Sequence, residues 1–213
     1  MKLNKPNATN KRSLRPQLLF VIGFASLLCL CACEEEEDFL SPKPRGYFRI
    51  DFPEKNYKPY DSLCPFRFEV PAYSEVVPNT QKNAEPCWQN IEFKRFKATL
   101  YLSYKPVNNN LPKYLDDAHE FANRHQIKAN GLEQIAIVRD SAKVYGLLFD
   151  ISGNTASSVQ FYLTDSTQHF LRGSLYFNCT PNADSLKKVI DFLKQDILHL
   201  INTTAWKNTE KIS

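Results

Sequence analysis

One uncharged apolar run near the N-terminus decides how much of this chain can enter a folded domain. No charged residue lies between Arg15 and Glu34, and residues 18–33 read LLFVIGFASLLCLCAC. Residues 1–32 contain five basic residues, all before this run, and no acidic residue. A basic start followed by a short apolar segment is typical of a secretory signal, which is removed from the mature protein. We therefore predict that residues 1–32 are an export signal and that the fold is built from the remainder.

The end of the apolar run indicates how this signal is processed. Leu30-Cys31-Ala32-Cys33 resembles a bacterial lipobox, in which a Leu three positions before a Cys and a small residue directly before it admit the lipoprotein signal peptidase. Cys33 would then be acylated on its sulfur and become the mature N-terminus. An uncleaved anchor helix is the alternative, because the uncharged stretch is just long enough to span a bilayer. Both interpretations place the rest of the chain outside the cytoplasm and attached to a membrane.

Five consecutive acidic residues, 34–38, follow Cys33 directly. Like charges in a row repel one another and favour a solvated tether, so we assign residues 33–41 to the lipidated cysteine and this tether. In the Bacteroidota, acidic residues at this place also resemble a signal that carries lipoproteins to the cell surface. Both alternatives stay open. We expect a lipid-anchored protein of the cell envelope, in the outer membrane, whose domain faces either the periplasm or the medium.

The charge of the mature chain argues against nucleic acid as a partner. The whole chain has 27 Lys and Arg against 23 Asp and Glu, but five of the bases belong to the export signal. The remainder carries 22 bases against 23 acids. Nucleic-acid binding needs a basic patch on the folded domain, and the overall excess of positive charge therefore gives it no support.

The mature domain keeps three cysteines, Cys64, Cys87 and Cys179. An odd number outside the cytoplasm suggests one disulfide and one free thiol. Three pairings are possible, and the sequence alone does not determine the connectivity. We expect Cys64–Cys87, because these two are nearest in sequence and both lie in proline-rich segments. Closing that loop would stabilise the fold by about 3 kcal/mol through its effect on the unfolded chain.

Prolines divide the mature chain into two parts. Ten of the 13 prolines lie within residues 42–112, whereas residues 113–213 hold one. Proline fixes its backbone angle and removes a hydrogen-bond donor, so the first part should be more extended and irregular. We predict a proline-rich extended segment over residues 42–63 and a single globular domain over residues 64–213.

Hydrophobic periodicity predicts the order of elements within this domain. The expected strands are 66–70, one or two over 91–104, and 134–139, 143–151, 156–164 and 168–178. Helices with single apolar stripes are expected over 111–128 and 183–201. Short links between successive strands require antiparallel neighbours. The predicted fold class is α+β, with helices packed on an antiparallel sheet, and the element order resembles the PsbP/Mog1-type α/β/α sandwich.

No residue pattern predicts a catalytic, metal or cofactor site. His119 and His125 are six residues apart on the first expected helix, a spacing that places them on different faces. Asp116, Asp117 and Glu120 form one polar helix surface, whereas acid–base chemistry needs carboxylates that face each other across a cleft. The sequence has neither a glycine-rich phosphate loop nor a Gly-x-Ser-x-Gly elbow. We therefore expect a protein that is not an enzyme and uses no cofactor.

Residues 41–53 carry cationic and aromatic side chains in an extended segment just beyond the tether. Their sequence, SPKPRGYFRIDFP, places Arg45, Tyr47, Phe48 and Arg49 between prolines. A strand of this kind can add to a sheet edge or lie in a groove of a partner, which makes these four residues candidates for partner binding. The alternative is that the segment straps across its own domain.

Several of these stretches together resemble one known family. They are the lipobox, PKPRGYFRIDFP, YDSLCPFRFEVP, CWQNIEF and a terminal helix that ends near Trp206. In combination they are similar to the gliding-motility lipoprotein GldD family of Bacteroidota, over nearly all of the mature chain. The resemblance implies a non-enzymatic envelope component that is required for gliding and associated with the type IX secretion machinery, whose other envelope proteins would be its partners. Of functional residues, only the lipidated cysteine carries over, onto Cys33.

A second hypothesis belongs to a different class. The domain could be a periplasmic or surface binding module that holds a small ligand in a pocket between sheet and helix. A closed, ligand-sized pocket lined by the Tyr and Phe side chains of the four strands expected over 134–178 would favour it.

Overall fold

The structure is a computed structural model that describes residues 49–126, 129–179 and 183–207. All of these belong to the compact unit Tyr47–Ser213. The predicted export signal, Cys33 and the acidic tether lie outside the described residues. Within the described part of the chain, no helix is long and apolar enough to cross a membrane.

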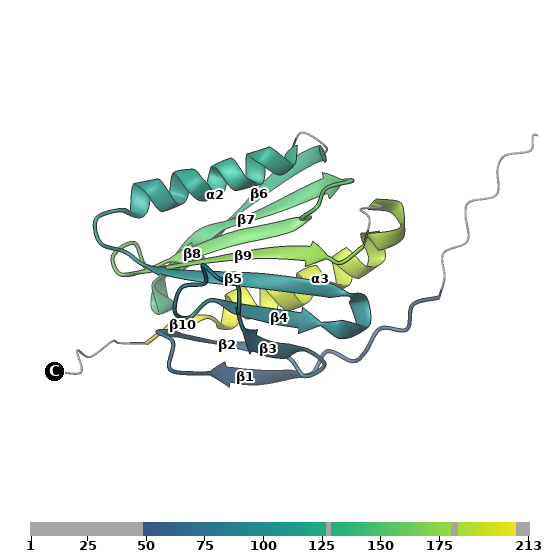
Figure 1. The fold of residues 1–213 in the computed structure, drawn as a ribbon, viewed down its shortest axis with the longest axis horizontal. Helices are drawn as coiled ribbons and strands as arrows, with labels where there is room; N and C mark the ends of the chain where they lie inside the picture. Colours follow the sequence, from purple (N-terminus) through teal and green to yellow (C-terminus); the bar gives the residue numbers. More distant parts are fainter. Residues whose placement is uncertain (1–48, 127–128, 180–182, 208–213) are drawn as a thin grey trace, which may run out of the picture. The chain divides into compact units, whose positions relative to one another are not determined.

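The described residues form two antiparallel sheets (Figure 1). The large sheet has the order β3-β4-β5-β9-β8-β7-β6, and the small sheet has the order β1-β2-β10. The bounds of the large sheet are β3 (Glu75–Pro78), β4 (Gln89–Phe93), β5 (Ala98–Pro106), β6 (Ala129–Arg139), β7 (Val144–Gly153), β8 (Val159–Thr164) and β9 (His169–Phe177). Those of the small sheet are β1 (Tyr57–Asp61), β2 (Phe66–Pro71) and β10 (Ala205–Trp206). The two helices are α2 (Leu111–Gln126) and α3 (Ala183–Thr203).

Tight turns connect neighbouring strands of the large sheet. The 3-10 turns η1 (Lys94–Phe96) and η2 (Asp140–Ala142) join β4 to β5 and β6 to β7. Each turn ends on a left-handed residue, Lys97 or Lys143, with φ of 49°. The strands β6, β7, β8 and β9 pair successively, which is the meander that the short links predict.

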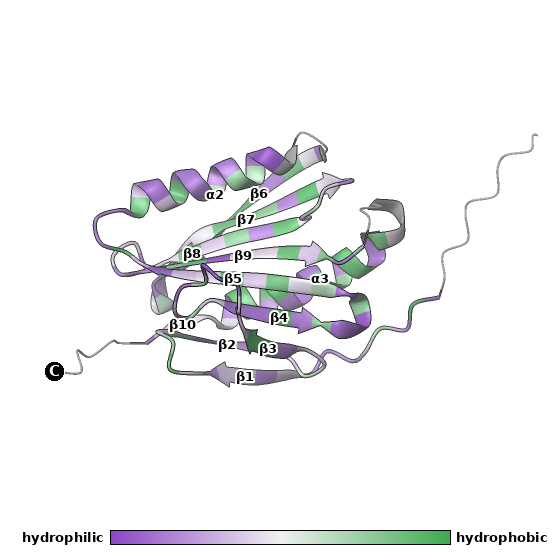
Figure 2. Cartoon of the chain, in the orientation of Figure 1, coloured by the Kyte–Doolittle hydropathy of each residue, from purple (hydrophilic) through white to green (hydrophobic). Residues whose placement is uncertain are grey.

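The helices cover opposite faces of the large sheet. On β8, Phe161 and Leu163 belong to the core that α3 closes, whereas Tyr162 between them belongs to the core under α2. Alternate residues of a strand point to opposite faces, so one strand serves both cores. The small sheet contributes Phe66 and Phe68 to the α3 core. Figure 2 shows polar and apolar residues sharing the surface of α2, as expected for a helix with one face on a sheet.

The predicted α+β class, with helices on an antiparallel sheet, is confirmed. The boundary predicted at residue 64 moves toward the N-terminus, because residues 57–61 form β1 and pair with β2. Pro59 is compatible with this strand since β1 lies at the edge of the small sheet, where a missing donor is tolerated. The proline-rich extended segment predicted over residues 42–63 therefore contributes a strand to the fold.

Candidate functional site

A cleft of about 590 Å³ opens beside α2 on its face of the large sheet. Its size falls within the range of small-molecule pockets, roughly 300–1,000 Å³. Aromatic side chains from the β3–β4 loop, β5, α2 and β9 dominate its lining: Trp88, Tyr101, Tyr114, Phe121, Phe170 and Tyr176. Sequence patterns did not predict this site, because its residues come from four separate segments.

The floor of the cleft is built by the pairing of β5 with β9. Ser103 lies opposite Arg172, and Lys105 lies opposite Phe170. Tyr101, Ser103 and Lys105 share one face of β5, because side chains alternate along a strand. At one end of the floor, Tyr176 meets the Tyr101 ring edge to face, with centroids 5.7 Å apart. The floor thus combines aromatic rings with two cations.

One wall of the cleft is the apolar stripe of α2. Tyr114, Ala118 and Phe121 follow at spacings of four and three residues, which places them on one side of the helix. The periodicity predicts that all three pack toward the core. Ala118 is buried, whereas Phe121 keeps 42% of its surface exposed and borders the cleft. An exposed ring in such a position is available to a ligand.

A second wall of the cleft is the β3–β4 loop, which a disulfide links to Cys64. Cys87 is joined to Cys64 with a Cα–Cα distance of 5.5 Å, and it has a left-handed φ of 66°. The next residue, Trp88, lines the cleft and donates its indole N–H to the backbone oxygen of Tyr104 at 3.0 Å. The disulfide and this hydrogen bond together hold Trp88 at the cleft. Cys179 is free and exposed.

The two cations of the floor have different surroundings. The ammonium of Lys105 lies 2.8 Å from a carboxylate oxygen of Glu85, which compensates its charge. Arg172 donates from Nη2 to the side-chain oxygen of Gln160 at 2.8 Å, and its guanidinium carbon lies 4.5 Å from the centroid of the Phe121 ring. Burial lowers the pKa of Arg172. Across residues 49–126, 129–179 and 183–207, Arg172 has no ion pair.

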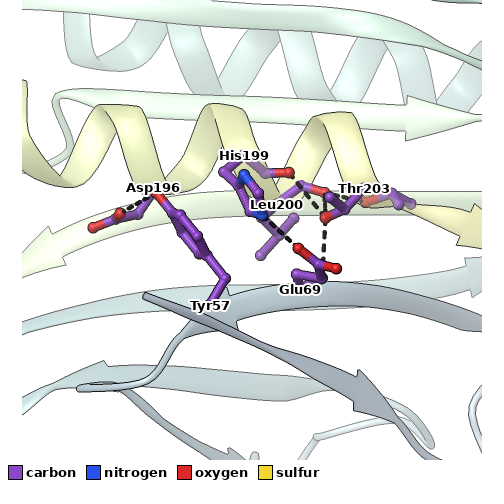
Figure 3. A network of polar contacts seen from close by, with 7 residues as sticks. Tyr57, Glu69, Asp196, His199, Leu200 and Thr203 are labelled. Carbon is purple, nitrogen blue, oxygen red and sulfur yellow. Dashed lines mark hydrogen bonds and ion pairs between the residues drawn. The ribbon is translucent and has the colours of Figure 1, made fainter. Parts of the chain in front are cut away.

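A second polar cluster, on α3, fastens the segment that follows the tether in sequence (Figure 3). Asp196 is 1% exposed, and its Oδ1 accepts hydrogen bonds from Lys55 Nζ at 2.6 Å and from the Tyr57 hydroxyl at 2.9 Å. Its Oδ2 accepts from the Tyr73 hydroxyl. Burial lowers the pKa of Lys55, although Asp196 acts in the opposite direction. A carboxylate with three donors of this kind is occupied in holding the fold together.

His199 extends this cluster to the small sheet (Figure 3). Its ring stacks on Tyr57 with centroids 3.6 Å apart, and its Nε2 lies 2.6 Å from Glu69 Oε2. Thr203 Oγ1 accepts from the backbone N–H of Glu69 at 3.0 Å and donates to the backbone oxygen of His199 at 2.9 Å. The last turns of α3 are therefore bound to both β1 and β2.

Of the candidate partner-binding residues, Arg45, Tyr47 and Phe48 lie outside the described residues, and their role stays a prediction. Arg49 is exposed and pairs with Asp51 at 3.1 Å. Three residues after Arg49, Phe52 stacks on Phe192 of α3, with centroids 4.4 Å apart. The end of the segment 41–53 therefore packs on its own domain, which was the alternative to partner binding.

The tyrosines around Asp196 predict a loss of stability at alkaline pH. Burial, followed by the hydrogen bond to Asp196, raises the pKa of Tyr57 to about 12 and raises that of Tyr73 as well. The unfolded value is about 10, so the contribution of both tyrosines is complete below pH 10 and falls as the pH rises above it; that of Tyr57 is lost as the pH passes through about 12. The lowered pKa of Lys55 has the opposite sign, but that effect ends near its unfolded value of about 10.4.

Urea unfolding between pH 9 and pH 11.5 checks this prediction, with Tyr73→Phe as the comparison. The variant keeps the ring but has no hydroxyl to ionise, so its stability should fall less steeply above pH 10. An identical pH dependence in both proteins would show that ionisation of Tyr73 does not contribute to alkaline unfolding.

No group of three or more side chains that could hold a metal ion gathers among the residues described. The chemistry that the cleft offers is instead stacking, hydrogen bonding and one cation that no carboxylate of the described residues pairs with. Outside the cleft, the fold gathers polar side chains around Asp196, and these side chains bind one another.

Comparisons with known proteins identify the family. The family described as Gliding motility lipoprotein GldD matches residues 36–206, which include the disulfide, the cleft and the α3 cluster. No curated protein matches this chain significantly. The solution structure of cyanobacterial PsbP (CyanoP) from Synechocystis sp. PCC 6803 is similar at 11% sequence identity and a TM-score of 0.45, covering 75% of this chain and 97% of that chain. On the strength of the match over residues 36–206, this chain belongs to the GldD family of gliding motility lipoproteins.

Proposed function

We propose that this gliding motility lipoprotein is a non-enzymatic component of the cell envelope that supports assembly or stability of the gliding and type IX secretion machinery. The family match carries the proposal, because it runs from the acidic tether to β10 and so includes nearly the whole mature chain. Acylation of Cys33 would hold the protein in the outer membrane. Its partners would be other envelope proteins of the same machinery.

The α3 cluster supports a role that depends on attachment. Lys55 and Tyr57 follow the tether in sequence, and both are bound to the buried Asp196. Phe52 adds a stacked contact with Phe192. We infer that these contacts transmit a pull on the anchor to the core helix α3, which suits a part of a motile apparatus.

Deletion of the gene tests this proposal. We expect colony spreading and type IX secretion to be lost together, and the wild-type gene to restore both. Intact spreading together with intact secretion in the deletion strain would contradict the proposal.

The cleft favours a second candidate function, the binding of a small ligand. Its volume and aromatic lining are those of a ligand site, and the sheet forms its floor while α2 and the disulfide-linked loop form its walls. The two functions are compatible, because a bound ligand could set the state in which the domain meets its partners. Saturable binding of the probe dyes described below tests this second function.

A further inference from the structure

We propose that the cleft binds a small organic anion with a flat apolar body, and that Arg172 selects for its negative charge. The inference rests on the second proposed function and names the class of ligand. Three observations carry it: the exposed rings, the uncompensated cation and the position of the other charges.

The exposed rings argue for a flat apolar body. Tyr101 and Phe121 are 37% and 42% exposed, and both border this one cleft. Large apolar side chains left open to water beside one another mark a binding site more often than an isolated exposed residue does. Rings of this kind gain most from a planar partner that stacks on them or meets them edge to face.

Arg172 argues for the negative charge. Its guanidinium is partly buried, bound to the neutral side chain of Gln160 and placed against the Phe121 ring. Burying a charge without a countercharge lowers the free energy of unfolding, so Arg172 destabilises the folded protein. A residue that is unfavourable for folding but stands in a cleft is typical of a binding function. A carboxylate or sulfonate beside Arg172 would supply the missing countercharge.

The other charged groups locate the anionic end of the ligand. Lys105 is already paired with Glu85, and it lies opposite Phe170 at one end of the floor. Asp117 lines the cleft from α2 and would repel an anion placed near it. The anionic group therefore belongs on the β9 side, at Arg172, while the apolar body lies toward Tyr101 and Phe121.

Two matched fluorescent dyes test the proposal. The first is 8-anilino-1-naphthalenesulfonate, and the second is N-phenyl-1-naphthylamine, which has the same rings without the sulfonate. The protein is the full mature chain with Cys33→Ser and an intact disulfide, so that neither lipid nor detergent takes up the dyes. Fluorescence titration gives the stoichiometry and the dissociation constant of each dye.

We expect one-to-one binding of the sulfonate dye. Arg172→Gln should weaken it about tenfold or more, because a charge-assisted hydrogen bond is lost, while affinity for the neutral dye stays within about twofold. Phe121→Ala should weaken both dyes. Arg67→Gln removes the same charge from an exposed position on β2, outside the cleft, and should change neither affinity.

The results that would contradict the proposal can be told apart from one another. If Arg172→Gln leaves the sulfonate dye unaffected, or weakens both dyes equally, selection for an anion is wrong although the cleft still binds ligands. If neither dye binds saturably, the second proposed function fails as well. Thermal unfolding of each variant checks the fold, and Arg172→Gln should unfold no earlier than the parent because it removes an uncompensated charge.

Discussion

Replacing Asp196 with alanine is expected to lower the free energy of unfolding by about 3 kcal/mol. The change removes the acceptor of three hydrogen bonds, from Lys55, Tyr57 and Tyr73. The Lys55 ammonium, whose side chain is only 25% exposed, would lose the carboxylate that compensates it. An unpaired partly buried charge is more unfavourable than the pair it came from. Urea unfolding at pH 7 measures the effect.

Asp191→Ala is the matched control for this prediction. Asp191 lies on the same helix and pairs with Lys187 at 3.3 Å, but both side chains are more than half exposed. Exposed pairs contribute little, so the control should lose no more than about 0.5 kcal/mol. Equal losses in the two variants would mean that the cluster around Asp196 does not fasten the N-terminal segment.

Removing the disulfide with Cys64→Ser and Cys87→Ser is expected to lower the free energy of unfolding by about 3 kcal/mol, because the unfolded chain gains the freedom of an open loop. One wall of the cleft should also be held less firmly, since its residue Trp88 directly follows Cys87. We therefore expect weaker binding of both probe dyes, measured by fluorescence in the same protein.

Cys179→Ser serves as the control for the disulfide variant. Cys179 is free and exposed, so its replacement should change neither stability nor dye binding. If the double variant keeps the stability of the parent, the link contributes nothing to this fold. If it loses stability but binds the dyes normally, Trp88 is placed by its hydrogen bond to Tyr104 rather than by the disulfide.

The main elements of the fold could be predicted because their signals are local. Residues 98, 100 and 102 alternate with polar neighbours and are buried in β5 as expected. The two helices begin and end within a few residues of the predicted bounds. The strand β1 was not predicted, because its sequence YKPYD contains a proline and no apolar alternation. It exists through pairing with β2, which is a tertiary effect.

The candidate site could not be predicted for the same reason. The periodicity of α2 correctly groups Tyr114, Ala118 and Phe121, but it cannot tell that Phe121 borders an open cleft above the sheet. The sequence pattern of β9 indicates neither that Arg172 is partly buried in a cleft nor that it donates a hydrogen bond to Gln160. Likewise, Asp196 meets Lys55 and Tyr57 across about 140 residues of sequence, as the separations of 141 and 139 show. Sites assembled from distant segments leave no short motif.

Complementation of the deletion strain with Cys33→Ser tests most directly whether the folded unit supports gliding and secretion from a lipid anchor. We expect this variant, produced at the wild-type level, to restore neither spreading nor type IX secretion, whereas Cys179→Ser should restore both. Full restoration of spreading and secretion by Cys33→Ser would contradict this expectation.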